Sequence, residues 1–221
     1  MRCPEVSLLQ VRNLGLRRGK AWVLRHLSFE LQRGEALAIT GPSGVGKSSL
    51  LWALLGLLEP EEGEVWLEGR PWSALSESQR RPLRPRFQAL FQDPHASLPP
   101  HRTGLEILEE PLRLHGRGDA SARREAVQAM AAKVKFPEGA LSQRPHQWSG
   151  GLAQRLSLAR ALMLQPALLA LDEPLSALDP TLASHLVDLL VELKEEGMAL
   201  LVVTHRPQSA WRLWDRELRL G

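Results

Sequence analysis

The order of apolar and polar residues predicts strands near both ends of the chain and helices in its middle. Apolar residues alternate with polar ones along 8–31, with a turn at 17–20, which indicates an antiparallel pair of strands. Further strands are predicted at 35–40, 62–69, 87–91, 167–171 and 198–204. Apolar residues at helical spacing predict helices at 48–58, 105–114, 120–134, 149–164 and 180–196. Because strands alternate with helices, the main sheet should be parallel.

Residues at the helix ends support this division and suggest how the chain is organised. Asp119 and Asp179 are candidate N-caps, and Pro180 and Gly197 suit the start and the end of the last predicted helix. The segment 93–165 is predicted as a helical subdomain inserted into an α/β core, which is formed by 1–92 and 166–221 and carries an antiparallel β subdomain. The basic, proline-rich stretch 70–86 is expected to be an exposed connection. The whole chain, 1–221, is thus predicted to be a single domain.

Composition narrows the classes of protein. A length of 221 residues suits one domain, and 43% apolar with 24% charged residues is typical of a packed globular protein and argues against collagen or a coiled coil. The net charge of +3 is too small to indicate a nucleic-acid partner. The single cysteine, Cys3, cannot form an internal disulfide, and the start of the chain lacks a secretory signal, so we expect a cytosolic protein.

One loop carries a phosphate-binding pattern. Residues 41–48 read GPSGVGKS and match G-x-x-x-x-G-K-[ST], between a predicted strand and a predicted helix. In this pattern the glycines let backbone N–H groups converge on phosphate, the lysine reaches the outer phosphates, and the last hydroxyl binds Mg²⁺. The candidate nucleotide-binding residues here are Gly41, Pro42, Ser43, Gly44, Val45, Gly46, Lys47, Ser48 and Ser49.

Two consecutive carboxylates follow a predicted buried strand. Asp172 and Glu173 come directly after 168–171, at the carboxyl edge of a sheet, where ligands bind in α/β folds. Asp172 is a candidate Mg²⁺ ligand, and Glu173 is a candidate base for an attacking water. Alone, such a pair is more often a solvated strand end. The phosphate loop in the same predicted sheet favours the catalytic interpretation.

A further segment resembles a motif of the ATP-binding cassette (ABC) ATPases, and this resemblance extends over the whole chain. Residues 148–152 read WSGGL, similar to the family's LSGGQ signature, with Leu152 at the fifth position in place of Gln. A hydroxyl and free amides at a helix start also make a second anion site. The resemblance implies a P-loop NTPase with a RecA-like core that works as a head-to-tail dimer. Each ATP would lie between the phosphate loop of one subunit and Ser149, Gly150 and Gly151 of the other.

Other family motifs occur in the expected order. Gln92 resembles the glutamine that contacts Mg²⁺ and the γ-phosphate, 176–179 resembles the D-loop with Asp179 at the dimer contact, and His205 resembles the switch histidine. With Lys47 and Glu173, Gln92 and His205 complete the implied catalytic set. The family's adenine-stacking aromatic is missing near Arg18, so either Arg18 or Trp22 is expected to contact the base. Trp22 could instead belong to the core of the β-sheet.

The segment 91–100, FQDPHASLPP, resembles ATPase subunits of peptide and nickel importers. This subgroup implies ATP and Mg²⁺ as cofactors, and a homodimer or a heterodimer with a second ABC ATPase. It also implies integral membrane permease subunits, an extracytoplasmic substrate-binding protein as an indirect partner, and a peripheral position on the cytoplasmic face of the cell membrane. Residues 93–102, with Leu98 as the central apolar contact, are expected to dock the permease. The end of the sequence at Gly221 favours the shorter nickel or metallophore subunits.

The alternative is an ABC ATPase that does not transport, or a subunit of a lipoprotein-release or division complex. Translation factors of this superfamily generally join two cassettes in one chain, and repair members insert a long coiled coil. Neither feature is visible in this sequence. We therefore predict a transport ATPase with no nucleic-acid partner.

Overall fold

A five-stranded parallel sheet forms the centre of the computed structural model, which describes residues 7–176, 178–205 and 212–221. Cys3 lies outside the described residues. The strands stand in the order β5 (Phe87–Leu90), β6 (Leu168–Asp172), β7 (Ala199–Val203), β3 (Ala36–Thr40) and β8 (Arg216–Arg219). Every pair of neighbours in this sheet is parallel, as the alternation of strands and helices predicts.

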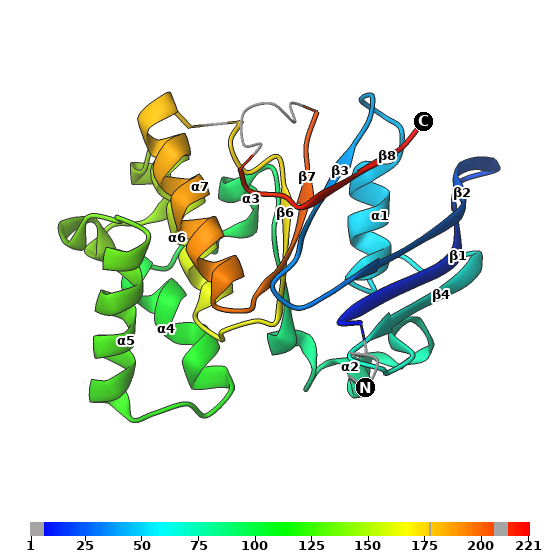
Figure 1. Cartoon of the computed structure of the whole chain (residues 1–221). Coiled ribbons are helices and arrows are strands. Elements are labelled where there is room, and N and C mark those ends of the chain that lie inside the picture. Colours follow the sequence, from blue (N-terminus) through cyan, green and yellow to red (C-terminus); the bar gives the residue numbers. More distant parts are fainter. Residues whose placement is uncertain (1–6, 177, 206–211) are drawn as a thin grey trace, which may run out of the picture.

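A second, antiparallel sheet lies beside the parallel one (Figure 1). Its order is β2 (Ala21–Leu31), β1 (Leu9–Arg18) and β4 (Glu62–Leu67). The turn between β1 and β2 falls at Gly19 and Lys20, within the predicted turn. Helix α1 (Lys47–Leu54) lies between the two sheets in Figure 1.

Another group of helices lies on the side of the parallel sheet away from the antiparallel one (Figure 1). They are α3 (Pro94–Ser97), α4 (Gly104–Leu114), α5 (Ala120–Lys133), α6 (Gly150–Leu162) and α7 (Pro180–Glu195). Asp119 caps α5 by accepting from the Ala122 N–H at 2.9 Å, and Asp179 caps α7, as predicted. The subdomain boundaries near 93 and 165 stay a prediction. Among the helices of the described part, none has the length and apolarity needed to cross a membrane.

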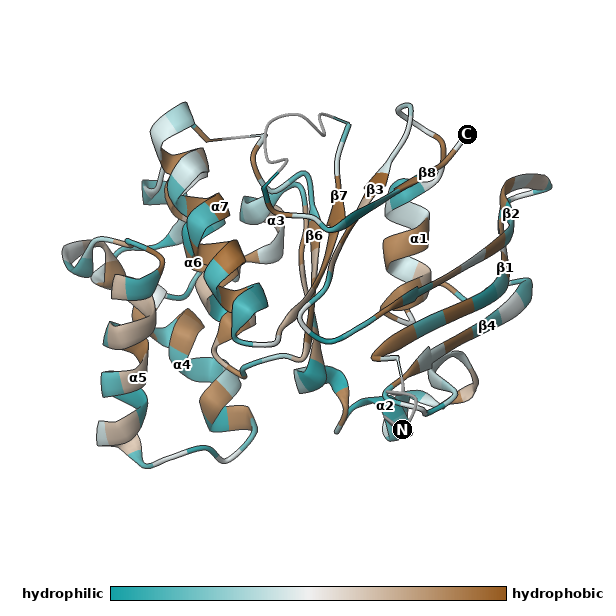
Figure 2. Ribbon diagram, in the orientation of Figure 1, coloured by the Kyte–Doolittle hydropathy of each residue, from teal (hydrophilic) through white to brown (hydrophobic). Residues whose placement is uncertain are grey.

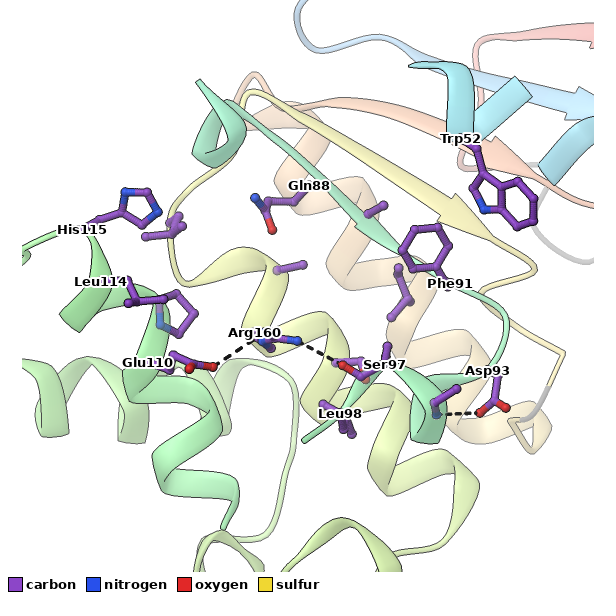
Figure 3. A pocket seen from close by; sticks show the side chains of 17 residues that line it. Trp52, Gln88, Phe91, Asp93, Ser97, Leu98, Glu110, Leu114, His115 and Arg160 are labelled. Carbon is purple, nitrogen blue, oxygen red and sulfur yellow. Dashed lines mark hydrogen bonds and ion pairs between the residues drawn. The ribbon is translucent and has the colours of Figure 1, made fainter. Parts of the chain in front are cut away.

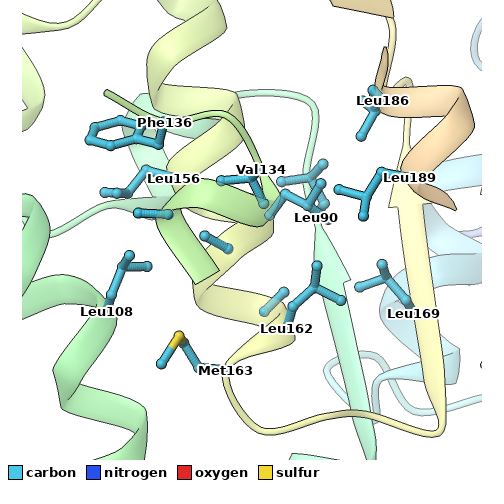
Figure 4. Packing of buried hydrophobic residues seen from close by; sticks show 14 of the residues in the cluster. Leu90, Leu108, Val134, Phe136, Leu156, Leu162, Met163, Leu169, Leu186 and Leu189 are labelled. Atoms are coloured by element: carbon cyan, nitrogen blue, oxygen red, sulfur yellow. The ribbon is translucent and has the colours of Figure 1, made fainter. Parts of the chain in front are cut away.

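The inner parallel strands β6, β7 and β3 are buried on both faces, so successive residues pack into two different cores. In β6, Leu169 and Leu171 face the helical side, while Leu168 and Ala170 face α1 and the antiparallel sheet. Figure 4 shows the helical-side core, where residues of α4, α6 and α7 meet the sheet. In Figure 2 the central strands are mostly brown, the colour of hydrophobic residues, whereas α7 is brown on one side and teal on the other. This double burial explains why these strands read as continuous apolar runs.

Several elements differ from the expectations, and the short helix α3 is one that was not predicted. Strand β8 was not predicted because its sequence, RELR, is mostly charged, which an edge strand tolerates. Helix α1 ends at Leu54 rather than at residue 58, because Gly56 turns the chain with a φ of +70°. A short helix, α2 (Glu77–Arg80), was also missed.

The expectation of an exposed connection over 70–86 is wrong in part. Trp72 is 1% exposed and belongs to the core under the antiparallel sheet. Arg80 is also buried, and its guanidinium donates to the carbonyl oxygens of Gly56, Trp72 and Ser73 at 2.9–3.1 Å. A buried cation needs such partners. The bond to Gly56 also connects this stretch to the end of α1.

Leu98 does not provide the exposed apolar contact that we expected. Its side chain is 4% exposed and packs in the helical-side core together with Ile107 and Leu158. Leu114, at the end of α4, is 68% exposed instead. Leu98 also lines a groove between β5, α3, α4 and α6, but because its side chain is almost fully buried, we expect a substitution there to act mainly on stability.

Replacing Leu98 with alanine should lower the free energy of unfolding by about 2–5 kcal/mol, because it leaves a cavity in a closely packed core. Leu114→Ala is the matched control and should change it by less than about 0.5 kcal/mol. Urea titration followed by circular dichroism measures both. Equal effects of the two variants would contradict the burial of Leu98.

Candidate nucleotide site

In the loop between β3 and α1, two positions have no room for a side chain and therefore require glycine. A Cβ on Gly41 would lie 2.5 Å from the Leu220 carbonyl oxygen, and a Cβ on Gly46 would lie 2.4 Å from Cγ1 of Val23. Gly46 also has a φ of +108° at the N-cap of α1. The loop therefore closes over the helix start with its amides free of side chains, which favours an anion.

Lys47 folds back over this loop. Its Nζ donates to the carbonyl oxygens of Gly41 at 2.8 Å and Pro42 at 2.9 Å. The ammonium group is thus held directly above the loop whose amides would bind phosphate. Both contacts are to neutral acceptors, so a phosphate oxygen would be a stronger partner for the ammonium.

Ser48 and Asp172 meet beside the loop. The Ser48 hydroxyl donates to Oδ2 of Asp172 at 3.2 Å, and Asp172 is 7% exposed at the end of β6. Burial raises the pKa of Asp172, and the Ser48 hydrogen bond acts in the opposite direction. A buried carboxylate beside a hydroxyl is an oxygen-donor pair of the kind that Mg²⁺ accepts. The described part of the chain holds no cluster of three or more His, Cys, Asp or Glu side chains that could bind a metal alone.

Glu173 has a strained backbone and a well-defined side chain. Its φ is +50°, which is uncommon for a residue other than glycine, and its N–H donates to the Val203 carbonyl at 2.9 Å. Its carboxylate accepts from the Thr204 hydroxyl at 3.3 Å and from the His205 N–H at 2.9 Å, and pairs with His205 Nδ1 at 2.6 Å. These contacts follow from the pairing of β6 with β7, which sets Asp172 opposite Val203. Thr204 was not singled out from the sequence.

These groups surround one cavity of about 480 Å³. The predicted residues that line it are Ser43, Gly44, Gly46, Lys47, Ser48, Ser49, Gln92, Asp172, Glu173 and His205. Residues that sequence reasoning missed also line it, namely Arg17, Val23, Trp52 and Leu58. Trp52 stands one helical turn after Ser48, a spacing that could have indicated its place on the same helix face. Gly41, Pro42 and Val45 shape the loop without lining the cavity.

The two residues that we expected as contacts to the nucleotide base, Arg18 and Trp22, lie in different places. Arg18 lines the cavity, whereas Trp22 does not. The Trp22 ring lies under the guanidinium groups of Arg17, at 4.1 Å, and Arg25, at 4.5 Å. Trp22 is partly exposed and does not belong to the buried core that we considered for it. The lining of the cavity therefore favours Arg18 over Trp22 as the contact to the base.

The signature residues lie at the start of α6 and do not line this cavity. Ser149 caps the helix by accepting from the Leu152 N–H at 3.4 Å, and Gly150 is exposed. Trp148 is buried and meets Phe136 edge to face, with ring centroids 5.6 Å apart. Ala177, within the predicted D-loop, lies outside the described residues.

Comparison with known proteins agrees with this geometry. Residues 24–176 match the family model described as ABC transporter. A Brucella ovis protein named for ATP binding in peptide import is 37% identical over 221 residues, covering 98% of this chain and 70% of that protein. The oligopeptide transport ATP-binding protein of Haemophilus influenzae is 39% identical over 197 residues, covering 88% of this chain and 59% of that protein.

Solved structures show the same fold. A dimeric ATP-binding cassette described in a post-hydrolysis state with ADP and Pi superposes with a TM-score of 0.88 and 30% identity, covering 96% of this chain and 94% of that chain. The Clostridium perfringens protein cbiO1, part of an ABC transporter complex, superposes with a TM-score of 0.85 and 26% identity, covering 97% of this chain and 85% of that chain. The chain belongs to the ABC transporter family. It has the ABC ATPase fold that the sequence predicts, and it is an ATP hydrolase of this type.

Lys47→Ala should weaken ATP binding by about 10- to 100-fold, because it removes the cation held above the phosphate loop. Lys20→Ala, in the exposed β1–β2 turn, is the matched control and should bind as the wild type does. Titration with a fluorescent ATP analogue measures both. An unchanged affinity in Lys47→Ala would contradict the assignment of the loop.

Proposed function

We propose that this chain hydrolyses ATP to drive a peptide importer. The observation that carries the proposal is the meeting of Glu173, the Ser48–Asp172 pair and the phosphate loop in one cavity. The peptide class is supported by relatives that are named for peptide, oligopeptide and glutathione import. These names favour peptides over nickel or a metal chelate.

The loop and its neighbours bind and orient the nucleotide. The amides of 41–49 and the ammonium of Lys47 hold the phosphates. Ser48 and Asp172, which already lie at hydrogen-bond distance, would hold Mg²⁺ together with Gln92, which also lines the cavity. When bound, Mg²⁺ neutralises charge on the phosphate oxygens.

Glu173 acts on the attacking water. Water adds to the γ-phosphorus while the bond to the bridging oxygen of ADP breaks, and the water's proton passes to the Glu173 carboxylate. His205 and Thr204 hold that carboxylate from the adjacent strand end. Because their donors come from the next strand, the carboxylate keeps its direction when the cavity fills.

The active form is a dimer, with a second copy or with a related ABC ATPase. Ser149, Gly150 and Gly151 offer a hydroxyl and amides at the start of α6, but they do not line the cavity of their own chain. They therefore act on the nucleotide of the partner, and Asp179 lies at the same contact. This arrangement leaves each ATP between two chains.

The permease subunits dock in a groove of about 720 Å³ beside the nucleotide cavity (Figure 3). Its walls come from β5, α3, α4 and α6, and Leu114 contributes exposed apolar surface. Arg160 holds the groove together by donating to the Ser97 carbonyl at 3.1 Å and by pairing with Glu110 at 3.8 Å. Trp52 lines both the groove and the nucleotide cavity, so the two share a wall. The protein thereby sits peripherally on the cytoplasmic face of the membrane, and an extracytoplasmic binding protein acts only through the permease.

Glu173→Gln should keep ATP affinity but reduce turnover by about 100-fold or more, because the amide cannot accept the water's proton. Glu195→Gln, on the exposed face of α7, is the matched control and should hydrolyse at the wild-type rate. Phosphate release and ATP binding are measured on the same preparations. Wild-type turnover in Glu173→Gln would remove this residue from the catalytic role.

Leu114→Glu should weaken capture of the co-expressed permease subunits by about tenfold or more, because a charge enters the apolar wall of the groove. Leu57→Glu is the control, since Leu57 is similarly exposed, at 61%, but does not line the groove. Quantitative pull-down measures association, and the melting temperature of each purified chain verifies folding. Equal capture by both variants would place the docking surface elsewhere.

A further inference from the structure

The helix that begins with the signature residues touches the loop that follows Glu173. The Gln154 side chain, on α6, donates from Nε2 to the carbonyl oxygen of Pro174. Nearer the start of the same helix, a Cβ on Gly151 would lie 3.4 Å from the Leu178 side chain. Helix α6 therefore approaches this loop at two positions, with a hydrogen bond at Gln154 and close apolar packing at Gly151.

The Gln154–Pro174 contact is buried. Gln154 is 5% exposed, and Pro174 is also buried. A buried carbonyl needs a donor, and the Gln154 amide supplies it. Oε1 of the same amide has no hydrogen-bond partner among residues that the structure describes. The hydrogen bond from Nε2 to the Pro174 carbonyl is therefore the interaction that holds the Gln154 amide in place.

The contact lies next to the strained residue of the site. On one side, the Glu173 N–H is bound to Val203 of the sheet. On the other side, the Glu173 carbonyl accepts from the Ser176 N–H at 3.2 Å and hydroxyl at 2.9 Å, which folds the loop back on itself. Gln154 provides a hydrogen bond that ties this folded loop to α6, and its partner is the residue directly after Glu173. The left-handed backbone of Glu173 is thus braced by the sheet before it and by α6 after it.

We propose that Gln154 is a positioning residue for ATP hydrolysis, which makes the direction of the Glu173 carboxylate depend on the position of α6. The inference rests on the proposed role of Glu173. Because α6 begins at Ser149, the same helix presents its start to the partner's nucleotide and holds the loop of its own catalytic carboxylate. A shift of α6 would therefore also shift the loop that follows Glu173 in the same chain.

The test uses Gln154→Met in the full chain, because methionine has a similar length, adds no charge and cannot donate to the Pro174 carbonyl. Turnover should fall by about 10- to 100-fold, the loss typical of a misplaced catalytic group, while ATP affinity stays at the wild-type value. Gln128→Met, the same substitution on the exposed face of α5, is the control and should leave turnover unchanged.

A double variant separates positioning from a general structural effect. If Gln154 acts through Glu173, adding Gln154→Met to Glu173→Gln should cause no further loss of turnover, whereas an independent effect would multiply the two losses. A loss of the same size in both backgrounds, or a wild-type rate in Gln154→Met, would overturn the inference. Wild-type turnover in Glu173→Gln alone would instead contradict the proposed function, so the two failures are distinguishable.

Discussion

The hydrogen bond from Ser48 to Asp172 joins two residues 124 positions apart, and the arrangement of the site depends on it. One partner begins α1 after the phosphate loop, and the other ends β6. Their meeting requires β3 and β6 to lie in the same parallel sheet with their carboxyl ends at one edge, which burial of both sheet faces enforces. The same burial keeps Asp172 away from water and raises its pKa, and a cation placed beside it would favour the charged carboxylate.

Parallel pairing also accounts for the position of the Glu173 carboxylate. Because β6 and β7 are in register at Asp172 and Val203, the next residues along both strands meet beyond the edge of the sheet. Glu173 leaves β6 with a left-handed backbone and turns its side chain toward Thr204 and His205. Such strain persists only where several contacts hold it, and here the sheet and α6 do so from opposite sides.

The helical part carries the two surfaces that we propose contact other chains. The start of α6 is exposed and carries the signature residues, whereas α3, α4 and the middle of α6 form the groove in Figure 3. Gln154 connects α6 to the loop that follows Glu173, and Trp52 lines both the groove and the cavity. A movement of the helical part on ATP binding would therefore displace both surfaces.

Local signals were sufficient for the phosphate loop, the buried strands and the caps at Asp119 and Asp179, because each depends on residues close together in the chain. The family motifs likewise identified the cassette, since their order is read along the sequence. Only the tertiary structure decided that Leu98 is buried while Leu114 is exposed, that a charged segment completes the sheet as β8, and that Gln154 reaches Pro174. These three features depend on which surfaces meet when distant segments pack. The sequence pattern of a single segment does not reveal which distant segment it will contact.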